Sequence, residues 1–236
     1  MPDRVARRVK PGAVGGRRSG FRVFIDFDNT ITVGDVLDGI IERFAVGEEW
    51  RELETAWAEG RIGARECLEG QLRSVRGDWQ EFARHLDTVQ LDPGFAALRQ
   101  TLATAGIELT IVSDNFDRFI AHILRRHHAD DLPCFANHLE VRDGGVEPSF
   151  PFSNPECPHC AHCKKIHFLP PNDDGRTVIY IGDGRSDLCP ARHAQVVFAK
   201  SSLLQTLRAE HVPCLAFDTL ADVAARLPTF IHETHL

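Results

Sequence analysis

Three groups of polar residues stand where short apolar segments of the chain end. They are Asp26, Asp28 and Thr30; Ser113, Asp114 and Asn115; and Asp183 and Asp187. In open parallel sheets, binding sites form outside the carboxyl ends of the strands. The groups are far apart in sequence, but we expect them to meet in one crevice. Each group alone also has the composition of a turn or a helix N-cap.

Asp26 is the residue that a turn explains least well. It lies between Ile25 and Phe27 at the end of an apolar segment, where an unpaired carboxylate is costly to bury. In extended chain the side chain of Asp28 leans the same way, and two close carboxylates repel unless a cation lies between them. With Asp183 as a third acid, the oxygens suit a hard cation such as Mg²⁺.

The chain has only four lysines, and two of them are the adjacent pair Lys164 and Lys165. This pair comes shortly before the apolar segment that leads to Asp183. A lysine ammonium is a compact point charge, suited to one phosphate oxygen or one carboxylate. The alternative is a solvated pair on the surface.

The elements that would position these residues alternate between strands and helices. Strands are predicted at 21–27, 107–112, 177–181, 195–199 and 214–217, helices at 95–104, 116–126, 186–194, 203–210 and 220–227, and a hairpin around 139–146. Short buried strands that alternate with helices indicate an α/β fold, with a parallel sheet covered by helices on both faces.

One stretch of the chain does not follow this alternation. Between Asp35 and Leu91 the pattern predicts only helices, at 36–45, 49–59, 64–75 and 78–89. We therefore expect a small all-helical unit over 35–91, inserted into a core made of 21–34 and 92–236. Residues 1–20 are rich in arginine and glycine, which predicts a disordered basic tail.

Composition excludes several classes of protein. The 236 residues carry a net charge of −7, which argues against nucleic acid as the main partner. No apolar run reaches the ~18 residues of a membrane-spanning helix. Seven cysteines, an odd number, form a poor disulfide framework and favour a reducing, cytoplasmic location. Oligomeric state is left open.

The order of the motifs resembles the haloacid dehalogenase (HAD) superfamily of phosphohydrolases. DFDNT ends the first strand, IVSDN the second, and a lysine precedes the strand that leads into YIGDGRSD. The resemblance covers about residues 21–227, and the helical insertion is similar to the small cap of the phosphoserine phosphatase-like branch. It implies a Rossmann-like core and a Mg²⁺-dependent hydrolase that removes phosphate from a small phosphorylated metabolite through an aspartyl-phosphate.

The resemblance also implies a role for each residue. Asp26 would be the nucleophile, and Asp28 the general acid and base. The phosphoryl group would be held by Ser113, the main-chain amide of Asp114 and Lys164. The metal would be bound by the Asp26 carboxylate, the Asp28 carbonyl and the Asp183 carboxylate, with Thr30 and Asp187 in support.

In this branch the cap selects the substrate. Phosphoserine phosphatases carry a Glu nine residues after the nucleophile and an Arg in the cap, whereas this chain has Asp35 and Gln71, with Arg73 nearby. The chain is most similar to phosphatases of 2-hydroxy-3-keto-5-methylthiopentenyl-1-phosphate in methionine salvage. Phosphatases of phosphoserine, phosphoethanolamine or phosphocholine, and pyridoxal phosphate are the alternatives. Asp35 is also a normal helix N-cap.

A dense group of cysteines precedes Lys164. Cys157, Cys160 and Cys163 could bind a structural Zn²⁺. A fourth ligand would come from Cys134, His159, His162 or Cys189. The alternative is a loop of free thiols that orients the lysine. A non-catalytic binding protein with this zinc on a HAD fold is the rival to an enzyme.

Overall fold

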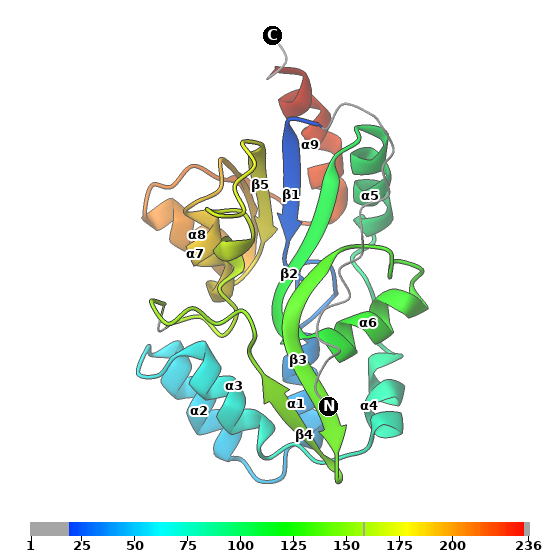
Figure 1. The fold of residues 1–236 in the computed structure, drawn as a ribbon, viewed down its shortest axis with the longest axis vertical. Helices are drawn as coiled ribbons and strands as arrows, with labels where there is room; N and C mark the ends of the chain where they lie inside the picture. Colours follow the sequence, from blue (N-terminus) through cyan, green and yellow to red (C-terminus); the bar gives the residue numbers. More distant parts are fainter. Residues whose placement is uncertain (1–18, 158, 234–236) are drawn as a thin grey trace.

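A seven-stranded sheet forms the centre of the computed structural model, which describes residues 19–157 and 159–233 (Figure 1). Most of the predicted basic tail lies outside the described residues. The strands, in the order β4-β3-β2-β1-β5-β6-β7, are β1 (Phe21–Ile25), β2 (Glu108–Phe116), β3 (Cys134–Arg142), β4 (Gly145–Ser149), β5 (Thr177–Gly182), β6 (Val196–Ala199) and β7 (Leu215–Ala216). All neighbours pair in parallel except β3 and β4. The predicted α/β class is confirmed, with a mixed but mostly parallel sheet.

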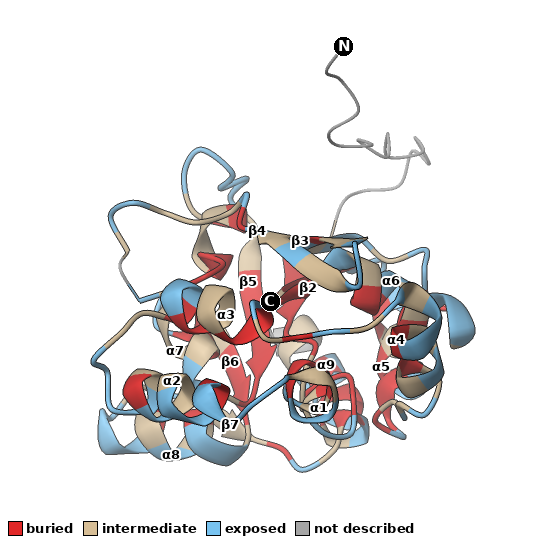
Figure 2. Cartoon of the chain, turned by 90° about the horizontal axis from the view of Figure 1, so that it is seen from below, coloured by how far each residue is buried: buried red, intermediate tan, exposed pale blue. Residues whose placement is uncertain are grey.

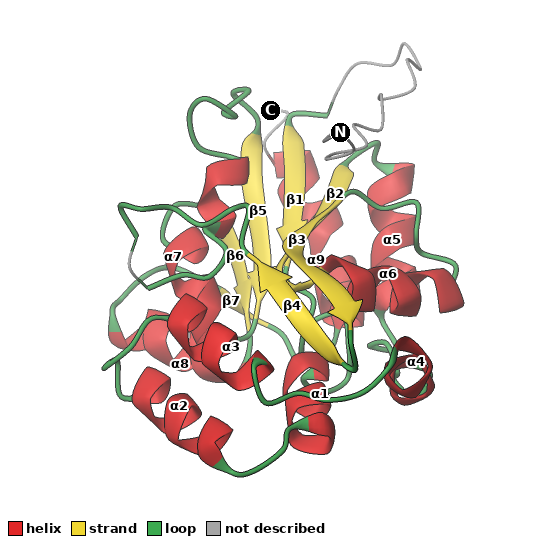
Figure 3. Ribbon diagram, turned by 60° about the horizontal axis from the view of Figure 1, so that its bottom comes forward, coloured by secondary structure: helices red, strands yellow, loops and turns green. Residues whose placement is uncertain are grey.

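Helices cover both faces of the sheet (Figure 3). One core contains Val23 and Ile25 of β1, and the other contains Phe24 between them, as the alternation of side chains along a strand requires. The first core includes α5 (Phe95–Thr104), α6 (Asp117–Arg126) and α9 (Leu220–Glu233), and the second includes α7 (Leu188–Ala191) and α8 (Ser201–Ala209). Figure 2 shows β2, β5 and β6 buried among these helices, whose outer faces are exposed. None of the described helices is long and apolar enough to cross a membrane.

Helices lie beyond the carboxyl ends of the parallel strands (Figure 1). They are α1 (Val36–Phe44), α2 (Glu49–Ala58), α3 (Ala64–Leu72) and α4 (Trp79–Leu86). The predicted helical insertion is therefore present as a cap over this edge of the sheet. Asp78 and Glu81 form a capping box at the start of α4, a pairing that satisfies two main-chain amides. The predicted helix over 64–75 ends early, and Val75 instead forms a β-bridge with Ala45.

The predicted hairpin is longer than its sequence pattern indicates. β3 begins at Cys134 and pairs in parallel with β2 before it turns back into β4. Its first half has no β-branched residue and no clear alternation, so the pattern shows only its end. The hairpin turn contacts the cap, where the Gly77 amide donates to the Gly144 carbonyl at 2.9 Å.

The predicted helix over 186–194 is a short 3-10 turn, η2 (Arg185–Asp187), followed by α7. The Asp187 carboxylate accepts hydrogen bonds from the main-chain amides of Asp183 and Gly184, at 3.0 and 3.2 Å. These two contacts hold the tight turn in place of a regular first helical turn.

Candidate active site

Members of all three polar groups line one cavity of about 160 Å³, whereas Thr30 and Asp187 lie behind them and do not line it. Asp26 follows β1, Ser113 lies near the end of β2, and Asp183 follows β5. Because these strands are parallel neighbours, their carboxyl ends bring the side chains to the same edge. The cap closes the cavity from the other side through residues of α1, α2 and α3.

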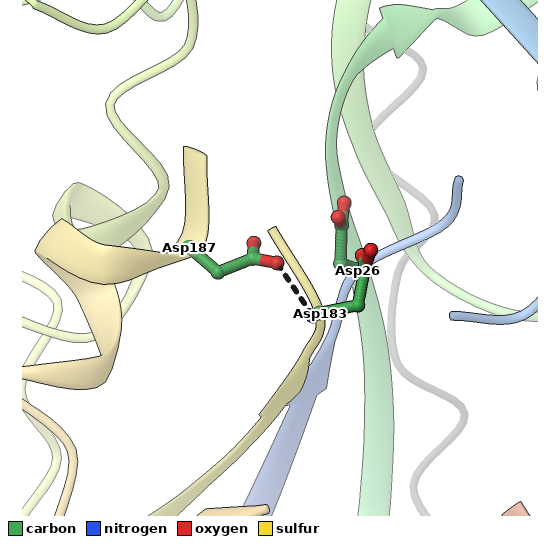
Figure 4. A group of neighbouring side chains, drawn as sticks. All are labelled: Asp26, Asp183 and Asp187. Atoms are coloured by element: carbon green, nitrogen blue, oxygen red, sulfur yellow. Dashed lines mark hydrogen bonds between the residues drawn. The ribbon is translucent and has the colours of Figure 1, made fainter. Parts of the chain in front are cut away.

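Three carboxylates form a group that fits a metal ion. Asp26, Asp183 and Asp187 are all buried, and each offers an oxygen within 4.8 Å of the others. Figure 4 shows Asp26 and Asp183 side by side, with Asp187 approaching from the helical side. Burial and the charges of their neighbours raise the pKa of Asp26 well above its usual range and that of Asp183 to about 7. A bound cation would relieve this repulsion, and oxygen ligands of this kind suit Mg²⁺.

Lys164 supplies a positive charge beside this group. Its side chain is fully buried, and its Nζ donates to Asp187 Oδ1 at 2.7 Å, to Asp26 Oδ1 at 2.8 Å and to Ser186 Oγ at 3.1 Å. Burial alone would lower the pKa of Lys164, but the carboxylates of Asp187 and Asp26 raise it well above the usual value. The ammonium is therefore charged at neutral pH. Neither Lys164 nor its neighbour Lys165 lines the cavity; Lys164 acts on it through Asp26 and Ser186, which do.

The Asp187 carboxylate accepts hydrogen bonds from several parts of the site. Besides Lys164, its Oδ1 accepts from the Tyr180 hydroxyl at 2.6 Å. A Cβ at Gly182 would come within 2.4 Å of Asp187 Oδ2, so glycine is required for this close approach. Burial raises the pKa of Asp187, but the Lys164 charge outweighs it and the net direction is downward. Nearby, the Thr30 hydroxyl donates to Asp183 Oδ1 at 3.2 Å, which orients that carboxylate.

Asp28 faces the cavity from the loop after β1. Asn115 Nδ2 donates to both of its carboxylate oxygens at 3.0 Å, and the Val36 amide donates to Oδ1 at 2.9 Å. Burial, together with the charge of Asp35, raises the pKa of Asp28 well above its usual range. The side chain is thus held in place and favours its protonated form. It does not belong to the three-carboxylate group.

The end of β2 carries the second polar group. Ser113 Oγ accepts a hydrogen bond from the Asn115 amide at 3.0 Å, and Asp114 Oδ1 accepts one from the His162 amide at 2.8 Å. Ser113, Asp114 and Asn115, all within β2, line the cavity. The structural contacts of Asn115, Tyr180, Ser186 and His162 were not predicted from sequence. The sequence pointed to Asn115 as the last residue of the second polar group, and to His162 only as a candidate zinc ligand.

The cap side of the cavity is acidic. Asp35, Asp38 and Glu54 line it together with Trp57 and the buried Gln71. Asp35 does cap α1, since its Oδ1 accepts from the Asp38 amide at 2.9 Å, and it faces the cavity as well. Arg73 does not line the cavity.

The predicted zinc site is not supported by the arrangement of the thiols. Cys157 Sγ and Cys160 Sγ lie 3.4 Å apart, but Cys163 Sγ accepts a hydrogen bond from Asn154 Nδ2 at 3.8 Å. Cys160 also forms a hydrogen bond with Cys189. Within residues 19–157 and 159–233, the three aspartates are the only group of three or more potential ligands whose atoms all lie within 4.8 Å. The three cysteines are close together in the sequence, but their thiols do not point to one metal position.

The sheet is mostly parallel, and carboxylates that fit a metal ion lie at its strand ends beside a buried lysine. This combination is typical of a phosphohydrolase with a doubly wound α/β fold. Comparison with protein families is specific: the model of the haloacid dehalogenase-like hydrolases matches residues 23–192. The chain belongs to this family, and is a HAD-family phosphatase.

Individual relatives and solved structures support membership of this family. A 2-hydroxy-3-keto-5-methylthiopentenyl-1-phosphate phosphatase of Exiguobacterium sp. is 30% identical over 86% of this chain and 95% of its own. One of Brevibacillus brevis is 31% identical over 85% and 92%. Among solved structures, a phospho-aspartyl intermediate analogue of phosphoserine phosphatase shares the fold, with a TM-score of 0.66 at 19% identity over 90% of this chain and 99% of that one.

Proposed function

We propose that the protein hydrolyses phosphomonoesters through an aspartyl-phosphate formed on Asp26. The observation that carries this proposal is the buried contact of Asp26 with Lys164, beside the carboxylates that fit Mg²⁺. In the proposed site Asp26, Asp183 and the main-chain carbonyl of Asp28 would hold the metal, and Asp187 would orient its surroundings. The bound metal would neutralise charge on the nucleophile and the phosphoryl group.

The proposed reaction has two halves. A carboxylate oxygen of Asp26 attacks phosphorus while the bond to the leaving oxygen breaks, and Asp28 gives its proton to that oxygen. The raised pKa of Asp28 supports this role, because it keeps a proton available near neutral pH. Asp28 then takes a proton from the water that attacks phosphorus, which releases phosphate and restores Asp26. Ser113, the Asp114 amide and Lys164 would hold the phosphoryl oxygens throughout.

We propose that residues 35–91 form the substrate-selecting cap and that 21–34 and 92–236 form the core. One candidate substrate is 2-hydroxy-3-keto-5-methylthiopentenyl-1-phosphate. Its support is the name shared by relatives that are 30% and 31% identical to this chain.

The acidic cap wall favours a second candidate, a phosphomonoester whose leaving group carries an ammonium. Burial and the carboxylates of Asp35, Glu54 and Glu42 raise the pKa of Asp38 to about 7. Arg185 is the one Lys or Arg among the described residues that line the cavity, and its guanidinium lies over the Trp57 ring and donates to the Ala58 carbonyl. A cation next to these acids would lower their mutual repulsion. Phosphoethanolamine and phosphocholine have this chemistry.

A substrate panel tests both candidates. With Mg²⁺ present, turnover is measured for p-nitrophenyl phosphate, the methylthiopentenyl phosphate, phosphoethanolamine, phosphocholine, phosphoserine and pyridoxal phosphate. For an ammonium substrate, Asp38→Asn and Glu54→Gln are expected to lower kcat/KM by about tenfold each, as for a lost charged contact, and to spare p-nitrophenyl phosphate. Glu52→Gln, on the first turn of α2, is the matched control.

Two results would redirect the proposal. If the methylthiopentenyl phosphate is the fastest substrate and is indifferent to Asp38→Asn, the acidic wall does not select the substrate. If folded protein turns over none of the panel with Mg²⁺, the binding-protein alternative replaces the enzyme. We also propose a cytoplasmic location, which the seven free thiols support.

A further inference from the structure

His162 is buried at the junction of the cysteine-rich loop and the end of β2. Its exposed fraction is 1%, and its ring stacks on Phe152 with centroids 4.8 Å apart. It contacts the second polar group twice: its main-chain amide donates to Asp114 Oδ1 at 2.8 Å, and its Nδ1 lies 2.9 Å from the Ser113 carbonyl. No step of the proposed reaction uses this ring.

The contacts of the ring determine where its proton lies. The Ser113 carbonyl can only accept a hydrogen bond, so His162 Nδ1 must carry a proton. His162 Nε2 lies 2.6 Å from His167 Nε2, and one proton must lie between them. Burial, then His167 and Lys164, lowers the pKa of His162 well below its usual value. His162 is therefore neutral with a bare Nε2, and His167 donates from its own Nε2.

His167 is itself held rigidly. Its ring stacks on Phe135 with centroids 4.1 Å apart, and burial lowers its pKa to about 4. His167 lies one helical turn after Lys164, at the end of the 3-10 helix η1 (Lys164–His167). The pair thus joins β2 to the segment that presents Lys164, whose amide donates to the His162 carbonyl at 2.9 Å.

We propose that His162, kept in a single neutral tautomer by His167, is a positioning residue that sets Ser113 and Asp114 against Lys164. This inference rests on the proposed phosphatase function, because those three residues are the ones proposed to hold the phosphoryl group. A displacement of about 1 Å in such groups can cost about 100-fold in rate. The effect should appear in kcat, since the geometry matters most in the transition state.

The test uses paired substitutions in the full-length protein. His162→Phe keeps the ring but removes both nitrogens, and is expected to lower kcat for p-nitrophenyl phosphate by about 100-fold with KM changed less than about threefold. His162→Asn places an amide donor where Nδ1 was, and should restore kcat to within about tenfold of the wild type. At position 167, His167→Gln keeps a donor toward His162, whereas His167→Phe removes it. The kcat of His167→Phe should therefore be about tenfold lower than that of His167→Gln.

The matched control is His127→Leu. His127 also bonds a main-chain carbonyl through its ring, that of Val89 at 3.2 Å, but Val89 does not line the cavity, whereas Ser113 does. Unchanged kcat is expected there. Circular dichroism and melting temperature establish that each variant is folded; if His162→Phe fails to fold, the comparison of His167→Gln with His167→Phe decides.

Nitrogen-15 NMR of the histidine rings at pH 7.5 gives a readout independent of turnover. His162 is expected to show a protonated Nδ1 and a bare Nε2, and His167 a protonated Nε2. A charged His162 or the opposite tautomer would overturn the inference. So would equal kcat in folded His162→Phe and wild type, or equal losses in His162→Phe and His162→Asn. Absence of turnover in the wild type would instead overturn the proposed function, and the NMR result alone would then decide the tautomer.

Discussion

Lys164 and Asp26, 138 positions apart in the chain, are joined by a buried ion pair with 2.8 Å between Nζ and Oδ1. The other two N–H groups of the ammonium are directed to Asp187 and Ser186. All three donors of the lysine are therefore in use. A phosphoryl oxygen can reach Lys164 only by replacing one acceptor, and Ser186 is the neutral one of the three. Substrate binding should therefore displace the Ser186 contact first.

Replacement of Asp26 by Asn should abolish turnover and leave the fold intact. The amide is nearly isosteric but cannot form the acyl phosphate, and it removes one charge from a repelling group. Turnover of p-nitrophenyl phosphate and melting temperature are measured together. Asp143→Asn, in the exposed hairpin turn, is the control. Activity above a trace in Asp26→Asn, with deamidation excluded by mass spectrometry, would contradict the nucleophile role.

Replacement of Lys164 by Met should destabilise the protein as well as inactivate it. The substitution leaves the carboxylates of Asp26 and Asp187 buried without their cation, and breaking a buried pair in this way costs about 3–5 kcal/mol. Urea denaturation measures the loss in the free energy of unfolding. The double variant Lys164→Met/Asp26→Asn should recover part of it. A single variant as stable as the wild type would show that this pair does not stabilise the fold.

Mg²⁺ with beryllium trifluoride should raise the melting temperature. The trifluoride mimics a phosphoryl group on the Asp26 carboxylate, and a ligand that binds only the folded state stabilises it by about 2.7 kcal/mol at roughly 100 times its Kd. Asp26→Asn should abolish the shift, and Mg²⁺ alone should produce a smaller one. No shift in the wild type at saturating concentrations would argue against a phosphoaspartate site.

Stability without metal should fall as pH rises from about 4 to about 7. The pKa of Asp183 is about 7 in the folded protein and about 3.9 when unfolded. Between these values the folded state binds more protons, so the free energy of unfolding decreases with increasing pH. The pKa values of Asp26 and Asp28 are raised in the same direction.

Urea titrations at pH 5 and pH 7.5 in EDTA measure this slope. Addition of Mg²⁺ should remove it, because the metal favours the ionised carboxylates, and Asp183→Asn should flatten it in EDTA. Greater stability at pH 7.5 than at pH 5 in EDTA would show that these acids do not control the slope.

The sequence was most informative where a residue type conflicted with its local surroundings. Asp26 at the end of an apolar run, followed by Asp28, is unusual enough to indicate chemistry before any contact is known. Tyr180 is the opposite case. It lies inside the apolar strand β5 and has the pattern of a core residue, yet its hydroxyl bonds Asp187, a contact that exists only once η2 folds back. The start of β3 was missed for a related reason, since its pairing with β2 and not its own propensity makes it a strand.

The lack of support for the zinc site, as against a loop of free thiols, has a similar physical cause. Spacing along the chain establishes that Cys157, Cys160 and Cys163 are near one another, but not that their thiols point to one centre. Cys163 is oriented by Asn154, and Cys160 reaches across to Cys189, which follows η2. The direction of each side chain depends on the loop path, and this is decided by contacts such as that between the His162 amide and Asp114.

The contact between the hairpin turn and the cap has a consequence for protein engineering. Arg76 bridges Gly145 next to the Gly77–Gly144 hydrogen bond, and the Ala64 amide donates to the His159 carbonyl. The helical insertion is therefore anchored at sites well away from its two chain junctions. Exchanging it for the insertion of a relative at those junctions alone would leave this anchorage mismatched. A chimera that transplants the β3–β4 arm and the loop around His159 with the helices would preserve it.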